Sequence, residues 1–210
     1  ATSTDTAGNT SAASTALAAT IDTTDPAAPG TADLVAGSDS GTADDDNITN
    51  NTTPVIAGTA EAGSTIELTS SLDGVVATTT ADGLGDWSVA TTALAQGDHD
   101  LTSTATDAAG NTGVSSAVLT ITVDTAAPVA PSAPDLAGFS DSGTADDDDI
   151  TSETTPTLTG TADPSTTVTL SSSLNGVVGT VTADGLGLWA ITTTTLSEGD
   201  HDLTATSTDT

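Results

Sequence analysis

The sequence predicts an all-β protein made of tandem β-sandwich domains that follow one another end to end in an elongated array. Three observations support this prediction. The chain repeats itself, so that Trp87 falls on Trp189, 102 residues later. Apolar and polar residues alternate with a period of two in short runs, which is the pattern of a half-buried strand. Gly, Asp and Asn, which favour turns, separate these runs. No segment sustains the spacing of apolar residues that is typical of a helix.

The repeat sets the domain boundaries. It keeps its spacing without insertion or deletion, so that Gly97–Leu101 falls on Gly199–Leu203. Its length suits one small domain rather than one unit of a solenoid. We expect residues 1–22 to be the C-terminal strand of a preceding repeat and residues 23–124 to be a complete domain. Residues 125–210 then form a domain that lacks its last strand.

Two interpretations of these incomplete first and last repeats remain open. The chain is a window on a longer array, because tandem arrays are commonly long. Alternatively, residues 11–21 complete the unfinished domain of another copy by donor-strand exchange, which would make the chain a self-assembling filament subunit.

The alternation predicts about seven strands in the complete domain. Ile66 and Leu68 share one face of a run, and Leu119, Ile121 and Val123 share one face of the last. Asp73-Gly74 lies between two runs as a hairpin signal. The strands are expected near Asp33–Ala36, Pro54–Thr59, Thr65–Ser71, Gly74–Thr80, Trp87–Thr92, His99–Thr106 and Ser115–Val123. Seven short antiparallel strands in about 100 residues are typical of an immunoglobulin-like sandwich.

The core of such a domain would be thin. Each repeat holds one Trp with a few Val, Leu and Ile among many small residues. Because Trp87 and Trp189 recur at the start of a strand, we expect them in the core rather than on a ligand-binding surface.

The charge is of one sign. The chain has 30 acidic residues, no Lys or Arg, two His and no Cys, and a formal charge of −30. The composition alone would favour disorder, whereas the ordered repeat favours a fold whose repulsion is relieved by counterions. Nucleic acid is not expected as a partner, because phosphate binding needs basic side chains. No apolar run is long enough for a membrane span.

The acids gather at the two ends of each predicted domain. The proximal end, where the linker from the preceding domain arrives, holds Asp22, Asp25, Glu61, Asp82, Asp107 and Asn111 in one repeat and Asp124, Asp163, Asp184 and Asp209 in the next. The distal end, where the chain leaves, holds Asp39, Asp44, Asp46, Asp98 and Asp100, and then Asp141, Asp146 and Asp148. Oxygen ligands without a basic partner favour Ca²⁺ over Mg²⁺ or Zn²⁺. The alternative is that these acids merely solvate the loops.

The combined motifs resemble those of bacterial Ig-like repeats in large RTX-type adhesins, over the whole chain. The motifs are "DxAGN", "VDTxAPxAP", "SDSGxxDDDxIT" and "ADGLGxW". The resemblance implies a secreted, cell-surface protein whose stiff repeats project a binding region for attachment or biofilm formation. It also implies calcium near the linkers, which suits Asp22, Asp107 and Asp124.

Three functions are therefore considered. The first is a calcium-stabilised extender with neighbouring repeats as its partners, and the second is the filament subunit. The third is an adhesive module whose outward Thr rows bind a ligand directly. An enzyme is not expected: His99 and His201 lie in "GDHD" motifs, but no nucleophile with its own partner accompanies them.

Overall fold

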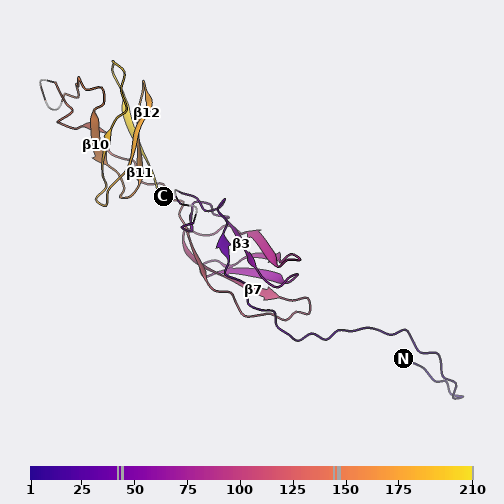
Figure 1. The fold of residues 1–210 in the computed structure, drawn as a ribbon. Coiled ribbons are helices and arrows are strands. Elements are labelled where there is room, and N and C mark those ends of the chain that lie inside the picture. Colours follow the sequence, from indigo (N-terminus) through magenta and orange to yellow (C-terminus); the bar gives the residue numbers. More distant parts are fainter. Residues whose placement is uncertain (42, 44, 144, 146–147, 210) are drawn as a thin grey trace.

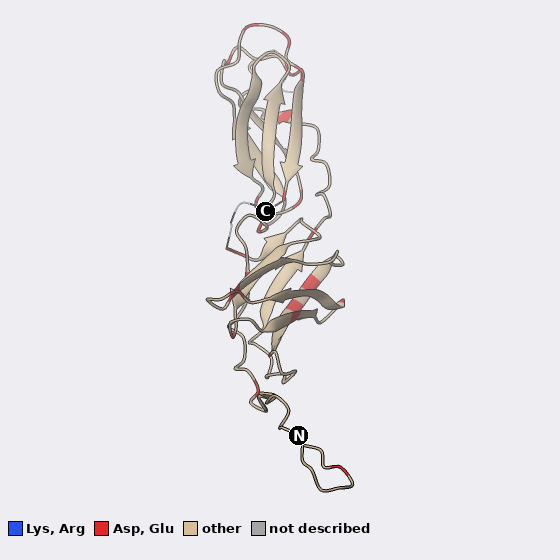
Figure 2. Cartoon of the chain, turned by 90° about the vertical axis from the view of Figure 1, so that its right-hand side faces the viewer, with Lys and Arg blue, Asp and Glu red and all other residues tan. Residues whose placement is uncertain are grey.

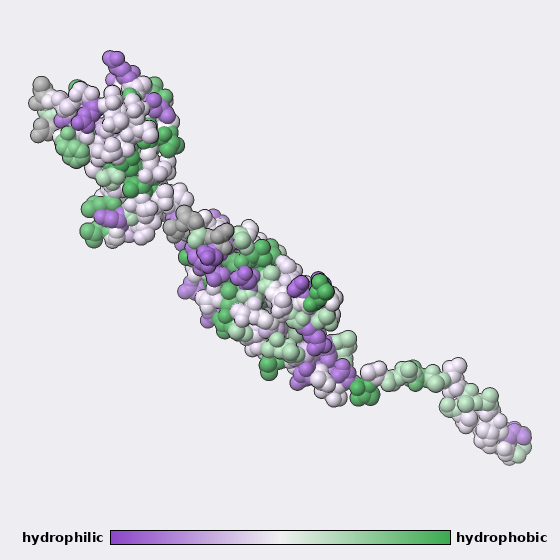
Figure 3. Space-filling view, viewed as in Figure 1, coloured by the Kyte–Doolittle hydropathy of each residue, from purple (hydrophilic) through white to green (hydrophobic). Residues whose placement is uncertain are grey.

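The computed structural model describes residues 1–41, 43, 45–143, 145 and 148–209, and these contain strands and no helix. Two β domains follow one another, and residues 1–22 project from the first as an extended segment (Figure 1). Hydrophobic and hydrophilic residues are interspersed over the visible surface of both domains (Figure 3). The predicted all-β array of sandwich domains is confirmed.

The first domain consists of two packed sheets. The larger sheet has the order β2-β8-β7-β4-β5, and the smaller has the order β1-β3-β6. Their inward side chains, among them Ile56, Leu68, Leu101 and Ile121, form one core. The strands are β1 (Asp33–Leu34), β2 (Ile48–Thr49), β3 (Val55–Thr59), β4 (Thr65–Ser70), β5 (Gly74–Thr80), β6 (Asp86–Ala90), β7 (Gly97–Thr106) and β8 (Leu119–Val123).

The structure differs from the sequence prediction at two strands. Strand β2 lies in the acidic stretch between the first two expected strands, where no strand is expected, and its Ile48 and Thr49 pair in parallel with Thr122 and Val123. A two-residue strand made by a distant partner has no local alternation. Strand β8 begins later than expected, because the Ser116 hydroxyl accepts the Ser103 N–H bond and interrupts the regular ladder.

The second domain repeats the first with fewer strands. Its sheets have the orders β13-β10-β9 and β12-β11-β14. The described residues contain no counterpart of β2 or β8 in this domain. Its strands are β9 (Asp135–Leu136), β10 (Thr157–Thr161), β11 (Thr167–Ser172), β12 (Gly176–Thr182), β13 (Leu188–Thr192) and β14 (Leu203–Thr208).

Each core is closed by its tryptophan. Trp87 and Trp189 are buried, at 4% and 3% exposure. Each ring lies against a glycine of the paired strand, Gly58 or Gly160, where a Cβ atom would stand 2.6 or 2.4 Å from the ring. The contact with the ring explains why a glycine stands in the interior of each of these two strands.

Candidate cation sites at the domain ends

Carboxylates without basic partners characterise the surface of the molecule. Figure 2 shows Asp and Glu and no Lys or Arg, in keeping with the sequence. Among the described residues, the one close contact between a basic and an acidic side chain is that of His99 with Asp73, whose Nδ1 and Oδ2 atoms are 3.6 Å apart. Almost every carboxylate must therefore be stabilised by hydrogen bonds, by water or by a soluble cation.

Asp107 organises the proximal end of the first domain. Its Oδ1 accepts the Ala109 and Asn111 amides, both at 2.9 Å, and its Oδ2 accepts Asn111 Nδ2 at 2.8 Å. Asn111 Nδ2 also donates to the Asp22 carbonyl at 3.3 Å. The structure thus brings the Asp22 backbone carbonyl, Asp107 and Asn111 together at the linker; their predicted role as metal ligands stays a prediction.

The hydrogen bonds at Asp107 favour its charged form. The amide of the Asn111 side chain, followed by the backbone amides of the turn, lowers the pKa of Asp107 below its ordinary value. The carboxylate therefore stays ionised well into acid, which suits a cation ligand.

Asp124 connects the linker to the first domain. Its Oδ1 accepts the Ala126 amide at 2.9 Å and Gln96 Nε2 at 2.8 Å, and these two bonds lower its pKa. Gln96 Oε1 in turn accepts the amide and the hydroxyl of Thr125. The sequence analysis did not include Gln96, because its bond to Asp124 joins residues 28 positions apart.

Asp124 and Asp209 line one cavity between the two domains. The cavity has a volume of about 280 Å³, and its other walls are Ser40, Gly41, Ile48, Thr49, Asn50 and Thr208. Asp209 is the repeat equivalent of Asp107, and Asp124 is the equivalent of Asp22. Both junctions therefore place a linker aspartate near the aspartate that ends a strand.

The remaining proximal residues occupy turns. Asp163 Oδ2 accepts the Val129 amide of the linker at 2.7 Å, so this carboxylate holds the linker against the second domain. Asp184 Oδ1 accepts the Leu186 and Leu188 amides. Asp25 and Glu61 are exposed.

Asp82 closes the same turn in the first domain, where the Leu84 and Asp86 amides lower its pKa. Because the folded-state pKa lies below the unfolded value, the stability that Asp82 contributes is present above the unfolded pKa and is lost as the pH falls through the folded pKa. We expect Asp82→Ala to lower the melting temperature modestly at pH 7 in metal-free buffer. The gap to the parent chain should close in strong acid. A gap that is constant across a pH series of thermal melts would contradict this assignment.

A buried carboxylate lies at the base of each acidic loop. Asp39 and Asp141 are each 8% exposed. One oxygen of each accepts a backbone amide across the loop, from Asn47 at 3.2 Å and from Asp149 at 3.3 Å. The other oxygen, Oδ1, is buried and has no hydrogen-bond partner among the residues that the structure describes, in either domain.

The other distal residues divide into three groups. Asp46 and Asp148 lie at the far side of the same loops, where their Oδ1 atoms accept the Ile48 and Ile150 amides. Asp98 and Asp100 are exposed on β7 and accept hydroxyl bonds from Thr122 and Thr120 of β8, so they face away from the loop. Asp44 and Asp146 lie outside the described residues.

The acidic loops suit a hard divalent cation better than the other acidic positions of the chain do. A buried carboxylate oxygen without a partner is costly unless something positive approaches it. The chain has no Cys and only two His, so the ligands that it can offer a cation are oxygens, which suits Ca²⁺. Within the described part of the chain, no three Asp, Glu or His side chains form one metal-binding group. A cation bound here would therefore also need backbone, hydroxyl, amide or water oxygens.

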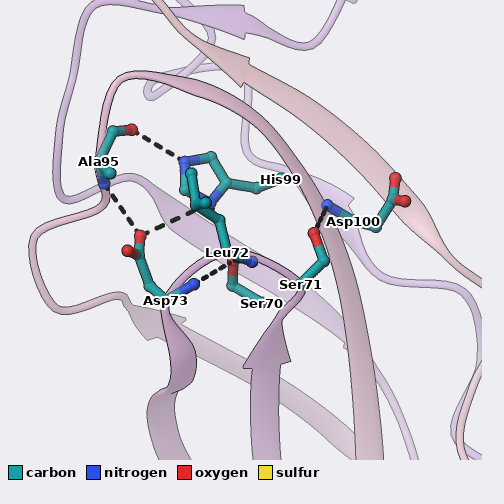
Figure 4. A network of polar contacts seen from close by, with 7 residues as sticks. All are labelled: Ser70, Ser71, Leu72, Asp73, Ala95, His99 and Asp100. Atoms are coloured by element: carbon teal, nitrogen blue, oxygen red, sulfur yellow. Dashed lines mark hydrogen bonds and ion pairs between the residues drawn. The ribbon is translucent and has the colours of Figure 1, made fainter.

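His99 is structural. Its side chain is fully buried, with Nδ1 at 2.8 Å from Ser70 Oγ and Nε2 donating to the Ala95 carbonyl at 2.9 Å (Figure 4). Asp73 completes the network by accepting the Ala95 amide. His201 makes the equivalent bonds to Ser172 and Ser197. The histidine thus ties the β4–β5 hairpin to the loop before β7.

The chain matches one family of known domains. The model of the family described as "Bacterial Ig-like domain" matches residues 26–125 and 128–210. No curated protein matches the chain. A solved structure described as "Biofilm associated protein - BSP domain" is 22% identical over 88% of this chain, with a TM-score of 0.28. This chain covers 27% of the length of that protein. None of the described residues forms a helix long and apolar enough to cross a membrane.

Proposed function

This chain belongs to the bacterial Ig-like domain family, and from that premise we propose that it is a calcium-stabilised extender segment of a bacterial cell-surface adhesin. In this role the repeats project a binding region away from the cell for attachment or biofilm formation, and they carry out no catalysis. The adhesin is a secreted protein of the large RTX type.

The observation that carries the proposal is the buried Oδ1 of Asp39, which has no hydrogen-bond partner within the described part of the chain, and the same arrangement at Asp141. A chain without Lys or Arg has no side chain, other than its two histidines, that could neutralise it. A cation at each acidic loop would remove this cost at the same place in each domain. In the first loop Asp39 and Asp46 would hold it, and in the second Asp141 and Asp148 would do so.

The linkers support the extender role. Asp124 is bonded to Gln96 of the first domain and lines a cavity with Asp209 of the second. At the preceding junction, Asn111 joins the Asp107 carboxylate to the Asp22 carbonyl. A cation shared by such groups would cross-link each linker to the next domain and would stiffen the joint. That is the property an extender needs.

The test compares Asp39→Asn with the parent chain in calcium and in EDTA. In calcium, the substitution should lower the melting temperature of the first domain, because it removes a charged ligand. In EDTA, it should leave the temperature unchanged or raise it, because it removes a buried charge that lacks a partner. Differential scanning calorimetry separates the two conditions.

The matched controls come from the chain itself. Asp141→Asn should behave in the same way in the second domain, whereas Asp33→Asn, at an exposed position on β1, should show no calcium dependence. If Asp39→Asn lowered the melting temperature equally in both buffers, the carboxylate would be purely structural and the loop site would be excluded.

A further inference from the structure

The acidic loop of the first domain, residues 38–51, takes part in the joint between the two domains. It contains the buried Asp39, and it also supplies one wall of the cavity of about 280 Å³ that Asp124 and Asp209 line. The loop residues in that wall are Ser40, Gly41, Ile48, Thr49 and Asn50. A rearrangement of this loop would therefore change the joint directly.

The two carboxylates proposed as cation ligands in this loop also hold the start of β2. Asp39 Oδ2 accepts the Asn47 amide at 3.2 Å, and Asp46 Oδ1 accepts the Ile48 amide at 3.0 Å. Asn47 has a φ of 62°, in the left-handed region that residues other than glycine seldom adopt. The bonds to the two carboxylates therefore hold the chain in a conformation that is disfavoured without them.

On its other side, β2 holds the start of the linker. The Asn47 carbonyl accepts the Thr122 amide, and the Thr49 carbonyl accepts the Asp124 amide, both at 2.9 Å. Strand β2 has only two residues, so these bonds depend on the position of a very short segment. A continuous path of hydrogen bonds thus runs from the Asp39 carboxylate through β2 to the backbone of the linker aspartate.

The loop is braced as one unit around Thr49. This side chain is fully buried, and its hydroxyl donates to the Ser38 carbonyl at 2.5 Å. The Ser40 hydroxyl accepts the Asn50 amide at 2.7 Å. Because both bonds connect the segment around Asp39 to the segment around β2, the two segments move together.

The buried charge of Asp39 opposes this closed arrangement unless a cation neutralises it. Its Oδ1 is buried and has no hydrogen-bond partner among the described residues. Hydration of that oxygen requires the loop to open, and opening releases the Asn47 amide and with it β2. The loop therefore has two states, and a cation that binds Asp39 selects the closed one.

We propose that β2 couples the loop cation site to the linker. A cation held by Asp39 and Asp46 closes the loop, pairs β2 with β8 and so fixes Asp124 at the joint. The inference rests on the proposed calcium binding, and it adds that the stiffness of the joint depends on a loop outside the linker. Coupling is reciprocal, so a cation at Asp124 raises the cation affinity of the loop by the same factor.

The experiment is amide hydrogen exchange, followed by NMR, of the parent chain and of Asp39→Asn in calcium and in EDTA. In the parent, calcium should slow exchange at Thr122 and Asp124 by roughly 5- to 150-fold relative to Ile121. Ile121 pairs with His99 of β7 in the middle of the sheet, so its amide reports global unfolding. In Asp39→Asn, which retains every linker carboxylate, this selective protection should be lost.

Asp141→Asn is the matched control. It removes the same charge from the acidic loop of the second domain, and none of the described residues of that loop lines the cavity at the joint. The selective protection should therefore remain as in the parent. Asp124→Asn tests reciprocity: it should weaken calcium binding at the loop by the same factor, measured from the chemical shift of the Asn47 amide during a calcium titration.

Two outcomes would overturn the proposal, and they differ from each other. If calcium protects Thr122 and Asp124 equally in the parent and in Asp39→Asn, the coupling is absent, even where calorimetry shows that Asp39 binds calcium. If the Asn47 amide does not shift with calcium and Asp39→Asn shows no calcium-dependent melting, the loop site itself is absent. The first result leaves the extender proposal intact, whereas the second removes its carrying observation.

Discussion

Chelation of calcium should lower the melting temperature of this chain by roughly 10–20 °C. A cation that binds only the folded state at a hundredfold excess over its dissociation constant contributes about 2.7 kcal/mol. For a domain of this size, 1 kcal/mol corresponds to about 4–8 °C. The effect should be large because the chain has a formal charge of −30, and each bound cation offsets part of the repulsion between its carboxylates. Chelation removes that offset.

The measurement is a thermal melt in calcium, in EDTA and in EDTA with added NaCl. NaCl should restore a minor part of the loss, because screening acts on exposed charges and much less on the buried Asp39 and Asp141. Magnesium should restore less than calcium does, since it demands a stricter octahedron. Small-angle scattering on the same samples should show a shorter particle in EDTA. Identical melts and scattering profiles with and without EDTA would refute the calcium proposal.

Trp87→Ala should destabilise the first domain by about 3–5 kcal/mol. The ring is almost fully buried against Gly58 and closes a core of otherwise small side chains. The denaturant midpoint of the first domain measures the loss. The second domain, which retains Trp189, provides an internal reference and a fluorescence signal.

Leu84→Ala is the matched control. Leu84 lies three residues before Trp87, in the adjoining turn, and is 89% exposed, so its removal should change stability by less than about 0.5 kcal/mol. A ligand-binding Trp would give the opposite pattern, in which Trp87→Ala leaves stability almost intact. That outcome would exclude the core assignment.

The candidate sites were only partly visible in the sequence. The linker aspartates could be predicted because each stands alone at the end of an alternating run. Gln96 could not be singled out, since its bond to Asp124 joins residues 28 positions apart. The burial of Asp39 could not be predicted either, because the same sequence stretch contains exposed acids such as Asp45 and Asp46.

The sequence by itself determined the repeat, most strands, the position of the tryptophans and the excess of negative charge. These properties are local or periodic, and periodicity reports which face of a strand is buried. Only the tertiary structure decided that Asp39 and Asp141 are buried, each with a carboxylate oxygen that has no hydrogen-bond partner among the described residues, and that Gln96 binds Asp124. Both depend on which distant segments pack together, because burial and strand pairing are properties of the assembled sandwich rather than of any one segment.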